Sequence, residues 1–247
     1  MSTQAPLIEI FSSLQGEGPH VGERHLFVRF QDCELSCKFC DTPLSFVINK
    51  FCRIEQPPFS KRYRHVPNPF TIEQLNATLL EFRETTLSLT GGEPLQKAPF
   101  LKNWLPTLKP RYQILLETAG VHVSEFKEIV SWIDIVSMDF KLPSSTGMHP
   151  WWREHESFLR TAKENQKEVY VKIVITAETA EKDIQRSRDL ILSIDPTIDV
   201  ILQPATAAAR FHAVPSLEQI SRWQDFLEEA LPRVRVIPQI HKQLGIS

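Results

Sequence analysis

Short hydrophobic runs alternate with longer, partly polar stretches along most of this chain. The short runs are rich in β-branched and aromatic residues, which favours strands, whereas the longer stretches have apolar residues three or four positions apart, which favours helices. The alternation therefore predicts repeated β-α-β units. We expect strands at residues 26–30, 86–89, 113–117, 135–140, 169–175, 200–203 and 234–237.

Most of the expected strands are apolar throughout and lack the alternation of a half-exposed sheet. Continuous apolar strands separated by helices are typical of a parallel sheet whose faces are both covered. We therefore expect an α/β fold, a partial (β/α)6-type TIM barrel with mostly parallel strands and outer helices. The same pattern allows a doubly wound parallel sheet as an alternative.

Two helix starts carry a capping-box pattern, in which Ser or Thr is followed three positions later by Glu or Gln. Thr71 precedes Gln74 in this way, and Ser216 precedes Gln219. The two side chains of such a box satisfy free backbone N–H groups of the first turn. Besides the helix after Thr71, we expect helices at residues 100–108, 124–132, 151–165, 180–193 and 217–231.

Composition acts mainly by excluding classes of function. The 247 residues carry a formal net charge of -2 and 42% are hydrophobic, which is typical of a soluble globular protein with no basic surface for nucleic acid. No uninterrupted apolar run of about eighteen residues and no secretory leader is visible. We expect a cytoplasmic protein that does not enter a membrane, with a single domain over residues 1–247.

The stretch after Pro43 shows no sustained hydrophobic period. It holds four further prolines up to Pro69 and a basic run from Lys61 to His65. Proline interrupts helices and central strands, so we expect a long loop insertion at about residues 43–70, lying over the cysteine site. A basic loop there would suit an electron donor such as flavodoxin, although charged loops are more often simply solvated.

Three of the four cysteines form a C-x3-C-x2-C run, as Cys33, Cys37 and Cys40. In a reducing compartment such close spacing indicates a metal site rather than disulfides. Thiolates suit a 4Fe-4S cluster, and three protein ligands leave one of its irons open to a small molecule. The alternative is a structural zinc site completed by Cys52 or a histidine.

Polar residues stand at the carboxyl ends of four expected strands. They lie at residues 90–93, at Glu117, at residues 137–141 and at residues 203–206. Any one of them could be a helix cap or a turn residue. Because the active site of a (β/α) barrel collects at this edge, their recurrence predicts one shared site at the barrel mouth.

The cysteine spacing, with the aromatic Phe39 before the last cysteine, resembles the cluster signature of the radical S-adenosylmethionine (SAM) superfamily. Residues 91–94, Gly-Gly-Glu-Pro, resemble the amine-binding motif of that superfamily. The resemblance implies that the open iron chelates the amino and carboxylate groups of SAM. One reducing electron would release methionine and a 5'-deoxyadenosyl radical, which takes a hydrogen atom from the substrate.

The segment at residues 11–18, followed by Gly22, Arg29 and Thr42, resembles the 7-carboxy-7-deazaguanine synthase family, as do residues 238–242. The resemblance implies a radical SAM lyase of queuosine and deazapurine biosynthesis. It would contract the ring of the small-molecule pterin 6-carboxy-5,6,7,8-tetrahydropterin to 7-carboxy-7-deazaguanine. The resemblance also implies a homodimer, a Mg²⁺ ion and an electron donor such as flavodoxin.

The same resemblance implies which residues hold each ligand, with no catalytic side chain expected beyond the cluster and SAM. For the substrate they are Leu14, Gln15, Gly16, Glu17, Arg29, Thr90 and His241, with the Arg29 guanidinium suited to the substrate carboxylate. For SAM they are Phe39, Gly91, Gly92, Glu93, Glu117, Ser137, Lys141 and Gln203. Cys33, Cys37 and Cys40 would bind the 4Fe-4S cluster, and Thr42 would give magnesium a hard oxygen.

The chain departs from the family pattern in three places. One is the basic, proline-rich loop after Thr42, which could contact a reductase or alter the substrate pocket, although such loops are more often simply solvated. Asp32 stands where the family commonly has glycine, so the turn that enters the cysteine segment would be built differently. Residues 137–141 differ from the close Ser-Pro-Lys succession of many members. Two other functions use parts of the same pattern, namely a glycyl-radical activating enzyme with the same cluster and cofactor, and a non-enzymatic zinc-binding interaction protein.

Overall fold

A ten-stranded sheet organises the computed structural model, which describes residues 3–208 and 211–246. Its strand order is β12-β11-β10-β9-β8-β7-β3-β2-β4-β5, and β1 pairs separately with β6. The strands are β1 Gln4–Ala5, β2 Leu7–Leu14, β3 Arg24–Phe30, β4 Phe51–Glu55, β5 Tyr63–Pro67, β6 Phe70–Thr71, β7 Thr86–Gly91, β8 Gln113–Thr118, β9 Ile135–Phe140, β10 Glu168–Ile175, β11 Asp199–Pro204 and β12 Val234–Val236.

Most neighbouring strands of this sheet run parallel. β3 and β7 pair in parallel, as do the successive strands from β7 to β12. β2 is antiparallel to β3, and β5 is antiparallel to β4. Within the described ranges β12 and β5 stay unjoined at the two edges, so the sheet forms an open, partial barrel.

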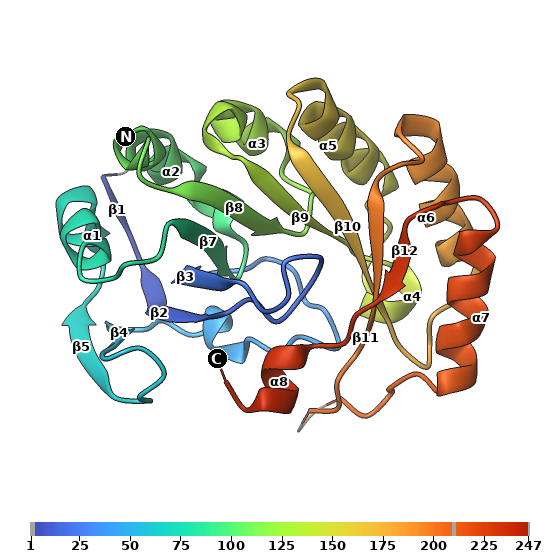
Figure 1. Ribbon diagram of the computed structural model, residues 1–247, viewed down its shortest axis with the longest axis horizontal. Helices are drawn as coiled ribbons and strands as arrows, with labels where there is room; N and C mark the ends of the chain where they lie inside the picture. Colours follow the sequence, from blue (N-terminus) through green and yellow to red (C-terminus); the bar gives the residue numbers. More distant parts are fainter. Residues whose placement is uncertain (1–2, 209–210, 247) are drawn as a thin grey trace.

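The long helices lie along the outer side of the sheet, whereas the short helix α8 lies on the other side (Figure 1). This arrangement confirms the expected partial barrel with outer helices and differs from a doubly wound sheet, whose helices cover both faces. The α-helices are α1 Ile72–Leu79, α2 Ala98–Trp104, α3 Val123–Ile129, α4 Pro143–Thr146, α5 Trp152–Glu164, α6 Glu181–Ile194, α7 Leu217–Glu228 and α8 Ile240–Leu244. The 3-10 helices are η1 Pro43–Phe46, η2 Pro94–Lys97, η3 Leu105–Leu108 and η4 Val130–Trp132.

Both expected capping boxes are confirmed. Thr71 Oγ1 accepts a hydrogen bond from the Gln74 N–H at 3.2 Å, and Gln74 Oε1 accepts one from the Thr71 N–H at 3.0 Å. Ser216 and Gln219 repeat the exchange at the start of α7. The expected helices also form, although the last turns at residues 105–108 and 130–132 tighten into 3-10 geometry. Among the helices of the described residues, none has the length and apolar character to cross a bilayer.

The barrel strands are buried on both faces, for two different reasons. Their outward side chains pack with the helices in the main hydrophobic cluster. Their inward side chains at the amino ends form a second cluster of Leu115, Ile135, Tyr170 and Ile201. Because side chains alternate along a strand, the inward positions two residues further on are Glu117, Ser137, Lys172 and Gln203. The barrel interior therefore changes from apolar to polar toward its mouth.

Two parts of the sheet were not expected. The interpretation of residues 43–70 as a loop is wrong for β4 and β5, which form a hairpin joined to the main sheet through β2. Cys52 and Ile54 point into the core, while the prolines lie between the strands or at the end of β5, where no central ladder bond is lost. β2 was missed because its buried polar residues Glu9, Ser12 and Ser13 interrupt the apolar pattern.

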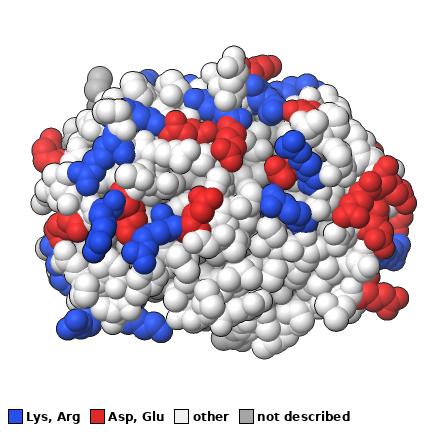
Figure 2. All heavy atoms as spheres, viewed as in Figure 1, with Lys and Arg blue, Asp and Glu red and all other residues white. Residues whose placement is uncertain are grey.

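Acidic and basic side chains are interspersed over the face seen in Figure 2, and basic side chains are more frequent on the side of β4 and β5. This distribution agrees with the near-neutral net charge of -2. The basic run of the hairpin thus forms a local feature of the surface, not a molecule-wide field.

The burial of His155 in the core can be tested by changing the pH. This residue of α5 stacks on Phe140 with ring centroids 4.8 Å apart, and its Nε2 accepts a hydrogen bond from the Lys141 N–H at 3.4 Å. Burial, together with the nearby Lys141 charge, lowers the pKa of His155 to about 3. Below a pH of about 6.5 the unfolded chain therefore binds a proton that the folded chain excludes.

We expect His155 to reduce the free energy of unfolding as the pH falls from about 6.5 toward 3, by up to about 1.4 kcal/mol per pH unit. His155→Gln should remove this part of the pH dependence. Anaerobic denaturant unfolding of both proteins at several pH values measures it. Since every other titrating group is shared, equal pH slopes for the two proteins would contradict the burial of a neutral His155.

Candidate active site

A cavity of about 610 Å³ opens at the carboxyl ends of the parallel strands. Small-molecule sites commonly measure about 300–1,000 Å³, so this volume suits a cofactor and a substrate. Every site residue expected from the sequence lines it, namely Leu14, Gln15, Gly16, Glu17, Arg29, Cys33, Cys37, Phe39, Cys40, Thr42, Thr90, Gly91, Gly92, Glu93, Glu117, Ser137, Lys141, Gln203 and His241. Their common location is observed, and their individual roles stay predictions.

The cysteine segment lies between β3 and η1, at one side of the cavity. Cys33, Cys37 and Cys40 are half-buried, and burial raises the pKa of all three thiols, that of Cys33 to about 12. A bound metal deprotonates such thiols outright. Cys52 differs, because it is fully buried in the hydrophobic core on β4.

The three thiols line the same cavity, where a metal group bound to all of them would be accessible to a small molecule. In the part of the chain that the structure describes, no three His, Cys, Asp or Glu side chains gather closely enough to hold one metal ion. A 4Fe-4S cluster binds its thiolates through different irons, so its ligands spread around the group instead of converging on a point. Three soft donors on one cavity wall have the chemistry that such a cluster requires.

The turn before Cys33 explains the departure at Asp32. Asp32 has a φ of 77°, in the left-handed region where glycine is favoured and where Asp is one of the better tolerated residues. Its N–H donates to the Ser45 carbonyl at 3.1 Å, and its carboxylate pairs with Lys97. The chain therefore keeps a glycine-like turn and adds an ion pair to it.

The two glycines at the end of β7 allow a close backbone approach. Gly91 has a φ of 128°, and the Gly92 N–H donates to the Phe30 carbonyl at 3.1 Å. A Cβ at Gly92 would overlap the Asp32 carbonyl oxygen and lie 3.0 Å from the Cβ of Cys33. The motif thus brings β7 against the start of the cysteine segment, besides opening its backbone to a ligand.

Glu93 is held rigidly beside these glycines. Its Oε1 accepts hydrogen bonds from the Leu95 N–H at 3.1 Å and from Thr118 Oγ1 at 2.9 Å, and its Oε2 accepts one from the Ala119 N–H at 2.8 Å. Burial raises the pKa of Glu93 despite these hydrogen bonds. Glu93 therefore has a fixed orientation at the cavity wall.

Glu117, which was expected to bind SAM, hydrogen bonds to residues that were expected to bind the substrate. Its Oε1 accepts a hydrogen bond from Gln15 Nε2 at 3.0 Å, and its Oε2 accepts one from Thr90 Oγ1 at 2.6 Å. Gln15 and Thr90 were expected at the substrate, whereas Glu117 was expected at SAM. The two expected subsites thus share one hydrogen-bonded wall.

Glu17 also connects the two expected subsites, because it contacts Gln203. It pairs with Lys172, and its Oε1 accepts hydrogen bonds from Gln239 Nε2 at 2.9 Å and from Gln203 Nε2 at 3.2 Å. Burial alone would raise the pKa of Glu17, but the adjacent Lys172 charge and these hydrogen bonds lower it. Lys172 was missed from the sequence, although a lone lysine inside the apolar run of β10 was a usable signal.

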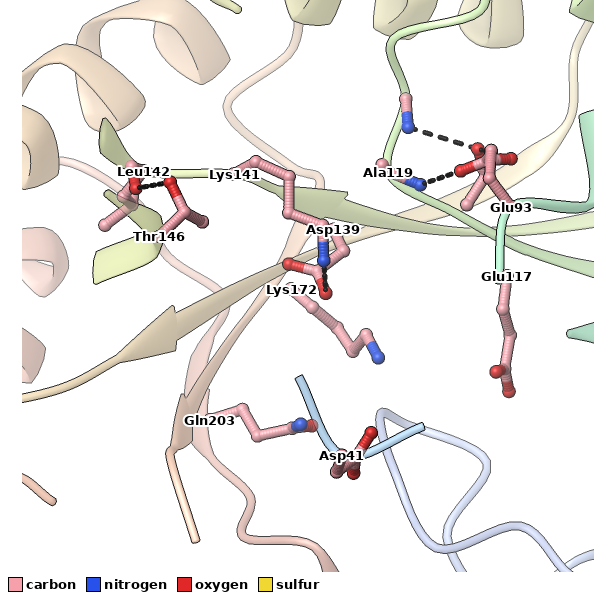
Figure 3. Close-up of polar contacts among 12 residues, drawn as sticks. Asp41, Glu93, Glu117, Ala119, Asp139, Lys141, Leu142, Thr146, Lys172 and Gln203 are labelled. Carbon is pink, nitrogen blue, oxygen red and sulfur yellow. Dashed lines mark hydrogen bonds and ion pairs between the residues drawn. The ribbon is translucent and has the colours of Figure 1, made fainter. Parts of the chain in front are cut away.

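Two further ion pairs complete the polar part of the cavity. Lys141 Nζ lies 2.7 Å from Asp139 Oδ2 and 5.7 Å from the centre of the Phe39 ring. Lys242 Nζ lies 2.9 Å from Asp41 Oδ2 and holds the pKa of Asp41 well below its usual range, although burial alone would raise it. Figure 3 shows the pair of Lys141 and Asp139, with Lys172, Gln203 and Asp41 pointing toward the same space from other strands and a loop.

The comparisons with known proteins agree with this geometry. The chain is 35% identical to the 7-carboxy-7-deazaguanine synthase of Geobacter sulfurreducens, covering 98% of this chain and 97% of that protein. It is 34% identical to the synthase of the same name from Methanopyrus kandleri, covering 95% and 91%. No family model matches the chain.

Solved structures share the fold at lower identity. QueE from Escherichia coli has a TM-score of 0.60 and 18% identity, covering 95% of this chain and 94% of that one. A radical SAM methyltransferase from Sphaerobacter thermophilus has a TM-score of 0.61 and 17% identity, covering 87% and 66%. These similarities support the partial barrel independently of the relatives' sequences.

The contact between Gly92 and the cysteine segment yields a prediction. Gly92→Ala should displace the Asp32 backbone, because the new methyl group has no room, and should destabilise the protein by about 1–3 kcal/mol. We expect less bound iron after anaerobic reconstitution. Gly22→Ala is the control for backbone strain without a steric clash, because a Cβ there meets no atom within 4 Å while the φ of 91° disfavours alanine. It should lose stability but keep its iron. Normal iron content in Gly92→Ala would show that the two segments are not closely packed.

Proposed function

This chain belongs to the 7-carboxy-7-deazaguanine synthase family of radical SAM enzymes, and from that premise we propose how its cavity performs the family's reaction. The reaction contracts the ring of 6-carboxy-5,6,7,8-tetrahydropterin to 7-carboxy-7-deazaguanine. One observation carries the proposal: the cysteine triad and the residues Gln15, Glu17 and Arg29 line the same cavity. The cofactor and the pterin would therefore meet there.

The cluster-binding and SAM-binding residues form one side of the proposed site. When bound, the 4Fe-4S cluster supplies the electron that cleaves SAM into methionine and a 5'-deoxyadenosyl radical. The Gly92 backbone lies directly against the cysteine segment, and the fixed carboxylate of Glu93 would accept hydrogen bonds from the amine of SAM. Ser137, Lys141 and Gln203 would contact the remaining polar groups of SAM.

The expected substrate-binding residues would hold the pterin next to SAM, because Gln15 and Thr90 both hydrogen bond to Glu117. Arg29 would bind the pterin carboxylate, and the Gln15 and Glu17 side chains would hydrogen bond to the polar edges of the pterin. The lysine partner of Glu17 keeps this carboxyl group ionised, so it would act as an acceptor. His241 would close the pocket, because α8 is seated on the chain at Gly16, whose carbonyl accepts a hydrogen bond from the Ile240 N–H at 3.0 Å.

The proposal also includes a Mg²⁺ ion, an electron donor and a homodimer. Thr42 Oγ1 lies 3.2 Å from Asp41 Oδ1, so two hard oxygen groups suited to Mg²⁺ stand together at the cavity wall. An electron donor such as flavodoxin would approach from the side of the cysteine segment. Family resemblance favours a homodimer and a cytoplasmic location.

The two alternative functions receive less support. A glycyl-radical activating enzyme would act on a protein backbone, whereas the relatives that match nearly the whole chain are named as synthases. A non-enzymatic zinc-binding protein is likewise disfavoured by relatives that are named as synthases over nearly the whole chain.

The full reaction is tested with the anaerobically reconstituted protein, SAM, a reductant, magnesium and 6-carboxy-5,6,7,8-tetrahydropterin. We expect 5'-deoxyadenosine and 7-carboxy-7-deazaguanine to form together, as followed by chromatography. Formation of 5'-deoxyadenosine alone would retain the radical chemistry and reject this substrate. Absence of both products, from protein with a verified cluster, would reject the proposed function.

The cluster ligands are tested one at a time. Replacing Cys33, Cys37 or Cys40 by alanine should abolish the cluster's visible absorption and the cleavage of SAM. Cys52→Ala should retain both, because that sulfur packs in the core, and it serves as the matched control. Loss of the cluster from a folded Cys52→Ala protein would overturn the ligand assignment.

A further inference from the structure

A row of three charged residues crosses the sheet at one end of the cavity. Glu9 on β2 is the register partner of Arg29 on β3 and also of Arg53 on β4. All three line the cavity. Arg29 Nε donates to Glu9 Oε1 at 2.9 Å, and Arg53 Nη2 donates to Glu9 Oε2 at 2.8 Å. The carboxylate therefore holds both guanidinium groups at fixed positions.

The charges of this row do not cancel. Elsewhere in the described cavity wall each lysine has its own carboxylate, since Lys172 pairs with Glu17, Lys141 with Asp139 and Lys242 with Asp41. Glu9 is instead shared by two cations. Glu9 thus offsets only one of the two positive charges of this row, and Asp41, the partner of Lys242, is close enough to act on Arg29 as well. Arg53 is the less compensated guanidinium group of the row, and it suits a ligand group with a negative charge.

An aromatic ring packs beside each of the two guanidinium groups. Arg29 lies over the Phe11 ring at 5.6 Å from its centre, and Arg53 lies over the Tyr63 ring at 5.3 Å. Both rings also line the cavity. Each guanidinium carries five N–H donors, and its hydrogen bond to Glu9 uses one of them. Further donors are therefore held ready for a second carboxylate.

We propose that Arg53 is a second carboxylate-binding residue of the substrate site, acting together with Arg29 and oriented by Glu9. This inference rests on the proposed function, which supplies a substrate with one carboxylate. It gives the β4–β5 hairpin a role in substrate recognition. Neither arginine would neutralise the carboxylate alone, because Glu9 already claims part of each positive charge.

The strength of the contact follows from its exposure. The Arg53 side chain is 39% exposed, against 19% for Arg29, so Arg53 stands nearer the mouth. Solvent screens such a contact, and hydrogen bonds between charged groups lose part of their strength there. We expect Arg53 to change substrate affinity by about 10-fold, at the low end for a charged hydrogen bond.

The experiment compares a pterin with and without the carboxylate. The reconstituted protein with SAM, in the absence of reductant, is titrated with 6-carboxy-5,6,7,8-tetrahydropterin and with 5,6,7,8-tetrahydropterin. The variants are Arg53→Met, Arg53→Lys as the charge-conserving change, and Arg64→Met as the control. Arg64 lies on β5 of the same hairpin, is 42% exposed and pairs with Glu81 outside the cavity.

Arg53→Met should weaken binding of the carboxylated pterin by about 10-fold, with a smaller loss for Arg53→Lys and no change for Arg64→Met. Binding of the pterin without the carboxylate should be equal in all four proteins. In turnover assays the loss should appear in KM rather than in kcat.

Three results would overturn the inference. Equal weakening of both pterins in Arg53→Met would assign Arg53 to holding the hairpin in place. Unchanged binding of the carboxylated pterin would exclude Arg53 from the site. If the wild-type protein binds and turns over no pterin, the proposed function fails, and this inference fails with it; normal wild-type turnover with either of the other results rejects Arg53 alone.

Discussion

The arrangement of the rest of the site depends on the buried ion pair between Lys172 and Glu17. Lys172 points into the barrel from β10, where an unpaired charge would cost several kcal/mol. Glu17 compensates it from the loop after β2, and Gln203 and Gln239 donate to the same carboxylate. The loop after β2, the barrel strands β10 and β11, and the segment before α8 all contact this carboxylate. They therefore form one continuous wall of the cavity.

The parts of the fold that follow from local pattern could be predicted from the sequence. Apolar runs located the parallel strands, and the boxes at Thr71 and Ser216 located two helix starts. The β4–β5 hairpin could not be located in this way, because the prolines in and around it are typical of a loop. Its strands are instead stabilised by pairing with β2, which is distant in the sequence. Long-range pairing leaves little trace in the local sequence.

The candidate site shows the same division. Residues carried by motifs, such as Glu17 and Arg29, were found in the sequence. Their partners were not, namely Lys172 and Gln239 for Glu17 and Glu9 for Arg29. A partner is chosen by register and by the meeting of distant segments: Glu9 reaches Arg29 and Arg53 only because β2 lies between β3 and β4. Motifs therefore reveal which ligands a site takes, and the tertiary structure reveals how their binding groups are charged and held.

The contact between α8 and Gly16 has a consequence for the order in which the cavity forms during synthesis. The cysteines at positions 33–40 leave the ribosome early, whereas Gln239 and His241, which line the same cavity, emerge after all the barrel strands. A nascent chain therefore exposes its thiols long before it can enclose a pterin. The order of the chain therefore leaves the thiols accessible to iron and sulfide for as long as the segment around α8 has not been made.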